Sequence, residues 1–157
     1  PKKLILIEIS EPNLYVLRQQ IEKSETNFIE KIYLLGDASN RLFLEKTLKF
    51  FGVNLLIHAA AYKHVPLVEA NPLEGIANNV LSTRVICSIA SELLLDQVLL
   101  ISTDKAVRPT NVMGASKRLA ELVVQAAAQK SSGTFFSMVR FGNVLGSSGS
   151  VVVLQVA

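Results

Sequence analysis

The sequence predicts an α/β fold built on a doubly wound, parallel sheet, and three observations predict it. The chain of 157 residues is half apolar and 18% charged, which excludes a disordered chain and indicates a dense core. Short, nearly continuous apolar runs recur along it, as in strands that are covered on both faces of a sheet. Segments with helical periodicity separate these runs, and such alternation is typical of parallel sheets.

The expected strands and helices follow in chain order. Apolar runs place strands at residues 4–7, 32–35, 55–57, 98–101 and 135–139, with a first helix from Asn13 onward. A 3-4 spacing between the third and fourth runs predicts one helix whose buried stripe is Ile76, Val80, Thr83, Cys87, Ala90 and Leu94. A helix over residues 113–130 is expected to bury Leu119, Leu122, Val123 and Ala126.

Composition argues against several classes of protein. The net charge is +3, no basic run exceeds two residues and tryptophan is absent, which argues against nucleic-acid binding. No apolar run approaches the roughly 18 residues of a membrane span, so none is expected in this segment. The single cysteine, Cys87, excludes an internal disulfide, and no metal site is expected because His58 and His64 lack ligand spacing.

Polar residues follow the strands, at the edge where parallel sheets bind ligands. Glu8 follows the first strand, where a carboxylate can accept hydrogen bonds from an adenosine ribose and repel a 2′-phosphate, favouring NAD over NADP. An equally good reading is a carboxylate at the positive end of a helix. Ala59, Ala60 and Ala61 follow the third strand, where small side chains admit either a cofactor or a tightly packed helix.

A glycine-rich phosphate loop would precede Glu8 by about 20 residues. None of the eight glycines forms that loop, and it is expected upstream of Pro1. The chain also begins within a strand and ends in an apolar stretch. We therefore expect residues 1–157 to be part of a nucleotide-binding domain in a longer protein.

The fourth strand is followed by Ser102, Thr103, Asp104 and Lys105. An acid adjacent to a lysine at a strand end can act as a general acid–base pair. Met113 and Lys117 lie four residues apart and share one helix face. The alternative is a surface ion pair with an exposed lysine nearby.

Three stretches, residues 58–72, 102–118 and 140–146, carry a resemblance to a known family. Over about residues 3–152 the chain resembles the extended short-chain dehydrogenase/reductase superfamily, and within it the CapD-like UDP-N-acetylglucosamine 4,6-dehydratases. The resemblance implies a Rossmann-type sheet, bound NAD with NADP as the alternative, a UDP-sugar substrate and a role in polysaccharide biosynthesis. It also implies a homo-oligomeric full-length protein on the cytoplasmic side of the membrane, with anchoring helices upstream as an option.

The reaction implied by the resemblance is redox-neutral. Hydride leaves C4 of the sugar for NAD, a base removes the C5 proton, the C6 hydroxyl leaves as water, and hydride returns to C6. By the same resemblance Lys105 is the C5 base, Asp104 the acid at C6, and Thr103 contacts the C4 hydroxyl. The remaining implied contacts are Lys117 with the nicotinamide ribose, Glu8 with the adenosine ribose, Asp37 with adenine, Ala59–Ala61 with the cofactor, and Asn143 with the substrate diphosphate.

Two departures from the family pattern stand out. Met113 occupies the position of the usual catalytic tyrosine, although the larger, membrane-anchored members look the same there. Since a thioether cannot take a proton, our hypothesis is that Asp104 takes over this role, through Thr103. After residue 152 the family usually continues with Pro-Leu-Phe, whereas this chain has Val153-Leu154-Gln155. The C-terminal substrate region is therefore expected to be absent or altered.

Two rival functions remain. A non-catalytic nucleotide-binding relative would explain Met113 as lost chemistry, but Thr103, Asp104 and Lys105 are intact and favour an enzyme. Nucleotide-sugar epimerases and reductases usually keep the tyrosine and lack the Asp-Lys pair. In a sheet ordered 3-2-1-4-5-6 the absent first strand is central, so the strands at 4–7 and 55–57 would lack their shared neighbour. We expect the isolated chain to be marginally stable, aggregation-prone and inactive.

Overall fold

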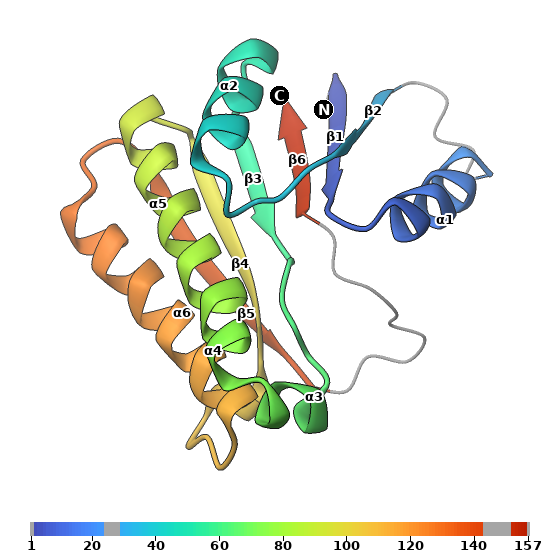
Figure 1. Cartoon of the computed structure of the whole chain (residues 1–157). Coiled ribbons are helices and arrows are strands. Elements are labelled where there is room, and N and C mark those ends of the chain that lie inside the picture. The colour runs from blue at the N-terminus through green and yellow to red at the C-terminus, as the bar shows by residue number, and fades with distance from the viewer. Residues whose placement is uncertain (1, 24–28, 143–151, 157) are drawn as a thin grey trace.

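The computed structural model describes residues 2–23, 29–142 and 152–156 (Figure 1). Its strands are β1 (Lys3–Glu8), β2 (Glu30–Leu35), β3 (Leu55–His58), β4 (Gln97–Thr103), β5 (Phe135–Phe141) and β6 (Val152–Val156). Its helices are α1 (Glu11–Glu22), α2 (Arg41–Phe51), α3 (Val65–Ala70), α4 (Pro72–Ile76), α5 (Ser82–Leu93) and α6 (Val112–Lys130). A π-helical turn, η1 (Ala77–Leu81), joins α4 to α5, and a 3-10 turn, η2 (Asp104–Ala106), follows β4.

The six strands form one sheet in the order β2-β1-β6-β3-β4-β5. The pairs β1–β2, β3–β4 and β4–β5 are parallel, and this confirms the expected α/β fold. Strand β6 lies between β1 and β3 and runs antiparallel to both (Figure 1). The expectation that β1 and β3 lack a shared neighbour is therefore wrong, because Leu154 pairs with Ile5 on one side and with Leu56 on the other.

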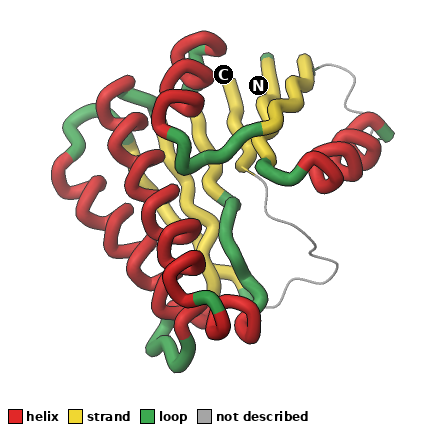
Figure 2. Tube along the Cα trace, in the orientation of Figure 1, coloured by secondary structure: helices red, strands yellow, loops and turns green. Residues whose placement is uncertain are grey.

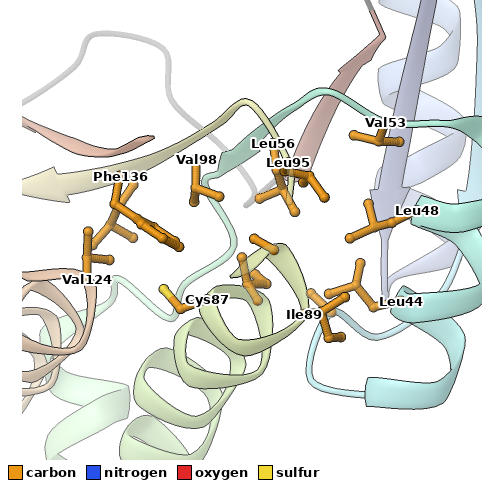
Figure 3. Packing of buried hydrophobic residues seen from close by; sticks show 14 of the residues in the cluster. Leu44, Leu48, Val53, Leu56, Cys87, Ile89, Leu95, Val98, Val124 and Phe136 are labelled. Atoms are coloured by element: carbon orange, nitrogen blue, oxygen red, sulfur yellow. The ribbon is translucent and has the colours of Figure 1, made fainter. Parts of the chain in front are cut away.

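Helices α2, α5 and α6 cover one face of the sheet and enclose the core (Figures 2 and 3). Cys87 is 4% exposed within this core, as the sequence predicts. The opposite face of β3 and β4 is half-buried by the described residues. Helix α1 packs against β1 and β2, and none of its own residues is fully buried. The core is formed largely by Ile5, Ile7, Leu44, Leu48, Leu56, Ile86, Ile89, Ala90, Val98, Leu100, Val124 and Phe136.

The long helical segment from α4 to α5 is confirmed, but its buried stripe is correct only in the middle. Thr83, Cys87 and Ala90 are buried, whereas Ile76 is 38% and Leu94 is 65% exposed. The π-helical turn inserts extra rotation between α4 and α5, so the face predicted from α5 does not continue into α4. Leu94 lies beyond the last helical turn, in the left-handed conformation that ends α5.

The predicted buried face of α6 is wrong. Leu119 and Leu122 are 45% and 43% exposed, and Ala126 is exposed too. The face that packs on the sheet instead carries polar and small residues, among them Ser116, Lys117 and Glu121. Apolar periodicity fails here because side chains with hydrogen-bonding partners replace apolar ones on the buried side.

Candidate active site

A cleft of about 580 Å³ opens at the carboxyl ends of β1 and β2 and beside the segment that follows β3. Four of the predicted cofactor residues line it together: Glu8, Asp37, Ala60 and Ala61. Ala59 is half-buried and does not line the cleft. Residues that follow three different strands therefore meet at one cleft, as expected at the carboxyl ends of parallel strands.

The two carboxylate oxygens of Glu8 differ in their hydrogen bonding. Glu8 is 5% exposed, and its Oε1 accepts a hydrogen bond from the backbone N–H of Ser10 at 2.9 Å, just before α1 begins. Its Oε2 is buried and has no partner among the described residues. One oxygen therefore serves the start of the helix, and binding of a ribose hydroxyl by the other stays a prediction. An unpartnered buried oxygen is costly, which favours a donor in the cleft.

Asp37 is held rigidly at the edge of the cleft. Its Oδ1 accepts from the backbone N–H of Ser39 and its Oδ2 accepts from the Ser39 hydroxyl, both at 2.7 Å. Each carboxylate oxygen keeps a second lone pair for a further donor. The arrangement suits recognition of an exocyclic amino group such as that of adenine.

The end of β4 holds the Asp-Lys pair. Oδ1 of Asp104 accepts from the Thr103 hydroxyl at 3.0 Å and from Lys105 Nζ at 3.4 Å. The hydrogen bond from Thr103, aided by Lys105, lowers the pKa of Asp104 below its usual value. Both side chains reach solvent, with 60% of Asp104 and 39% of Lys105 exposed. The pair is thus an ionised, accessible carboxylate beside an amine.

Two glycines show what packs against this pair. A Cβ on Gly142 would lie 3.7 Å from Asp104 Oδ2, which puts the end of β5 beside the carboxylate. A Cβ on Gly114 would lie 2.5 Å from the Lys105 carbonyl oxygen, so a side chain there would push the turn away from α6. Asn143, the predicted substrate contact, lies outside the described residues.

The first turns of α6 bring Met113 and Lys117 to the same strand end. Asn111 begins the helix by accepting a hydrogen bond from the Gly114 backbone N–H at 2.8 Å. Met113 is 3% exposed and Lys117 is 6% exposed, and Lys117 Nζ donates to the Ile101 carbonyl at 2.7 Å. Burial lowers the pKa of Lys117 to about 8, against the opposing effect of the Glu121 charge. Lys117 therefore contacts β4 two residues before Thr103.

Sequence reasoning missed two buried polar residues in this region. Asn79, in the π-helical turn, accepts from the Tyr62 N–H at 2.7 Å and donates to the Tyr62 carbonyl and the Ser116 hydroxyl. Glu121 is fully buried and accepts hydrogen bonds from three side chains. Its spacing of four from Lys117 and eight from Met113 could have identified it, whereas nothing local marks Asn79.

His58 has a structural role, in keeping with the sequence. Its Nε2 lies 3.0 Å from the Thr83 hydroxyl, which itself donates to the Asn79 carbonyl at 2.7 Å. Since that hydroxyl has one proton, His58 must be the donor in their bond. Burial lowers the pKa of His58 to about 3, so the ring is neutral.

The described residues offer neither a metal-ligand cluster nor a membrane-spanning helix. In those ranges no group of three or more His, Cys, Asp or Glu side chains could hold a metal ion. Within the same parts of the chain, no helix has the length and apolar character needed to cross a bilayer.

Known sequences resemble the chain over most of its length. CapD, the capsular polysaccharide biosynthesis protein of Staphylococcus aureus, is 45% identical over 154 residues, which are 98% of this chain and 26% of CapD. The UDP-glucose 4-epimerase of Rickettsia rickettsii is 43% identical over 78% of this chain and 36% of its own length. The chain thus spans about a quarter to a third of these relatives.

Solved structures share the fold. Pen from Bacillus thuringiensis superimposes with a TM-score of 0.83 at 32% identity, over 96% of this chain and 45% of Pen. DesIV, a dTDP-glucose 4,6-dehydratase from Streptomyces venezuelae solved with NAD bound, matches with a TM-score of 0.67 at 21% identity, over 79% of this chain and 41% of its own. The family described as polysaccharide biosynthesis protein matches residues 1–156. The chain therefore belongs to this polysaccharide biosynthesis protein family, with CapD among its relatives.

Proposed function

We propose that the full-length protein is an NAD-dependent nucleotide-sugar 4,6-dehydratase acting on UDP-N-acetylglucosamine. The observation that carries the proposal is the carboxylate–amine pair at the end of β4, with Asp104 Oδ1 and Lys105 Nζ 3.4 Å apart. Removing a proton from C5 and the hydroxyl from C6 needs a base that acts at C5 and an acid that acts at C6, the neighbouring carbon. Hydride transfer at C4 alone needs only one base, for the C4 hydroxyl proton. An adjacent pair is therefore more than a simple oxidoreductase or epimerase requires.

The residues of the cleft fit a dinucleotide. Glu8 Oε2 is a buried acceptor without a partner in the described chain, suited to a ribose hydroxyl, and Asp37 keeps lone pairs for adenine. A 2′-phosphate would add negative charge beside the Glu8 carboxylate, so NAD is favoured over NADP. When bound, NAD supplies reversible acceptance of one hydride, which leaves the overall reaction redox-neutral.

The proton transfers can be assigned to two side chains. The Asp104 carboxylate accepts the C4 hydroxyl proton, with Thr103 orienting it by their 3.0 Å hydrogen bond. Lys105 then takes the C5 proton, and protonated Asp104 gives its proton to the C6 hydroxyl, which leaves as water. Lys105 finally returns a proton to C5 as C6 is reduced. The lowered pKa of Asp104 keeps its carboxylate ionised, as the first step requires.

Lys117 and Met113 have different parts in this scheme. Lys117 holds the nicotinamide ribose, with its ammonium anchored to the Ile101 carbonyl. Met113 is buried and carries no exchangeable proton, so it shapes the wall of the site without transferring a proton. This division explains how the reaction can proceed without a tyrosine at position 113.

A 4-epimerase is the second candidate function. It is favoured by the 43% identity with a protein named UDP-glucose 4-epimerase. Such a reaction would invert C4 and leave Lys105 without an essential proton transfer, because no proton is removed from C5. A non-catalytic module, the third possibility, would bind NAD and a UDP-sugar and change neither.

Product analysis separates these functions. The full-length protein is incubated with UDP-N-acetylglucosamine and, separately, with UDP-glucose, and the products are examined by mass spectrometry and NMR. Loss of one water without net consumption of NAD supports the dehydratase. An unchanged mass with inverted C4 identifies an epimerase, and unchanged sugars beside bound NAD identify a module, either of which overturns the proposal.

A further inference from the structure

Glu121 joins three elements around the Asp-Lys pair through one buried carboxylate. Its side chain is 0% exposed. Oε1 accepts from the Ser102 hydroxyl at 2.7 Å and from Arg140 Nε at 2.8 Å. Oε2 accepts from Arg140 Nη2 at 2.7 Å and from Arg118 Nη1 at 2.9 Å. One side chain of α6 thus ties together the ends of β4 and β5.

The two strand ends that Glu121 joins are those that flank Asp104. Ser102 directly precedes Thr103, and Arg140 lies two residues before Gly142, whose Cβ position is 3.7 Å from Asp104 Oδ2. Bidentate contact with an arginine fixes direction as well as distance. The carboxylate of Glu121 therefore links the side chains of Ser102 and Arg140, two residues paired across β4 and β5 just before the catalytic pair.

Glu121 also lies one helical turn after Lys117, on the same face of α6. Its negative charge favours the protonated form of Lys117, whose burial opposes that charge. Among the residues that the structure describes, His58 on β3 also interacts electrostatically with Lys117, and its ring is neutral. Arg118 and Arg140 contribute positive charge to the same cluster.

We propose that Glu121 is a positioning residue for the reaction: it holds the ends of β4 and β5 so that Asp104 and Lys105 meet the substrate, and its charge balances that of Lys117. The part that concerns the substrate rests on the proposed function. The part that concerns Lys117 does not, because cofactor binding can be measured without turnover.

The chain offers a matched control at its surface. Glu92 on α5 accepts from the Ser88 hydroxyl and pairs with Arg41, the same combination of serine and arginine. The Glu92 side chain is 48% exposed, whereas that of Glu121 is 0% exposed. The variants Glu92→Gln and Glu121→Gln thus remove the same charge from similar partners in different surroundings.

The experiment measures NAD affinity against pH, and kcat and KM for the UDP-sugar, in the full-length protein. For the native protein, NAD affinity should fall above a pH of about 8 as Lys117 loses its proton. In Glu121→Gln this fall should begin about one pH unit lower, and kcat should drop roughly tenfold or more with a smaller change in KM. Glu92→Gln should match the native protein in both measurements.

Two results would overturn the proposal: an unchanged pH dependence in a folded Glu121→Gln variant, or equal effects of the two glutamine variants. Should Glu121→Gln fail to fold, Ser102→Ala serves as the test, because it keeps the charge and removes one donor. It should lower kcat severalfold and leave the pH dependence of NAD binding intact, and an unchanged kcat would count against the proposal. Native protein without dehydratase turnover, but with the shifted pH dependence in Glu121→Gln, would refute the proposed function and retain the Glu121–Lys117 coupling.

Discussion

At the scale of single residues, the site combines ionisable groups whose surroundings differ sharply. Asp104 and Lys105 reach solvent, whereas Lys117 and Glu121 are buried within two turns of one helix. Position after a strand was enough to place Glu8, Asp37 and the Asp-Lys pair at the carboxyl edge of the sheet, while their roles stay predictions. It could not predict Glu121, because that residue lies in mid-helix and depends on partners 19 residues away in both Ser102 and Arg140.

Lys117 should destabilise the fold at neutral pH. Lowering the pKa of Lys117 from 10.5 to about 8 costs about 3 kcal/mol of folding free energy. Replacing Lys117 would remove this cost but would also lose its hydrogen bond to Ile101, worth about 1 kcal/mol. Lys117→Met is therefore expected to raise the free energy of unfolding by about 2 kcal/mol at pH 7. Urea unfolding measures the change, with the exposed Lys49→Met as control.

The same lysine predicts a dependence of stability on pH. Between about pH 8 and 10.5 the unfolded chain holds a proton on Lys117 that the folded chain has released, so stability from this group rises with pH. Native protein should show this rise, and Lys117→Met should lack it. A Lys117→Met variant that is less stable than the native protein at pH 7 would contradict the first expectation, and an equal rise with pH in both proteins would contradict the second.

Asp104 and Met113 should separate proton transfer from packing. Asp104→Asn removes the acceptor for the C4 proton and should reduce kcat by at least about a hundredfold. Met113→Leu conserves volume at a buried position and should change kcat only modestly. Steady-state kinetics of the full-length protein check this, and equal losses in the two variants would refute the role given to Asp104.

At the scale of elements, the extent of helix α6 could be predicted from the sequence, but its buried face could not. Its extent, Val112–Lys130, agrees with the predicted 113–130, because Asn111 caps its start and its residues favour helix. Its orientation did not follow from apolar spacing, since Leu119 and Leu122 face outward while Lys117 and Glu121 face inward. Tertiary hydrogen bonds decide which side of this helix is buried.

The ends of α2 and α5 give a testable contrast. Both stop at a residue with a left-handed backbone, Gly52 with φ 61° and Leu94 with φ 53°. Left-handed backbone disfavours a Cβ by about 1 kcal/mol or more, and the Leu94 side chain is mostly exposed. Leu94→Gly should therefore increase stability by about 0.5–1 kcal/mol.

A glycine in a helix interior should have the opposite effect. Leu122 is an exposed leucine within α6, and Leu122→Gly should decrease stability by about 1 kcal/mol. Thermal unfolding of the two variants beside the native chain provides the comparison. A decrease of similar size in both variants would show that Leu94 contributes packing that outweighs its backbone strain.

At the scale of the whole molecule, the sheet depends on β6. This strand pairs along both sides and links β2-β1 to β3-β4-β5. The apolar C-terminal stretch gives no indication of its partners, because antiparallel insertion is set by backbone pairing between distant segments. The expectation that the isolated chain is marginally stable stays a prediction, but unpaired β1 and β3 no longer support it.

Proline in the middle of β6 should test this link. Leu154→Pro removes a backbone donor from the strand that pairs with Ile5 and Leu56, and should lower stability by about 3 kcal/mol or split the unfolding transition. Leu154→Ile keeps the donor and should leave a single transition. Circular dichroism in increasing urea follows both, and a native-like transition in Leu154→Pro would rule out a central β6.

The proposed dehydration at the end of β4 is tested most directly in deuterium oxide. Full-length protein is incubated there with UDP-N-acetylglucosamine, and the product is analysed by mass spectrometry and NMR. We predict loss of one water and one solvent deuterium bound to C5, delivered by Lys105, with no net consumption of NAD. A product that keeps its C6 hydroxyl and its original C5 hydrogen would contradict the account.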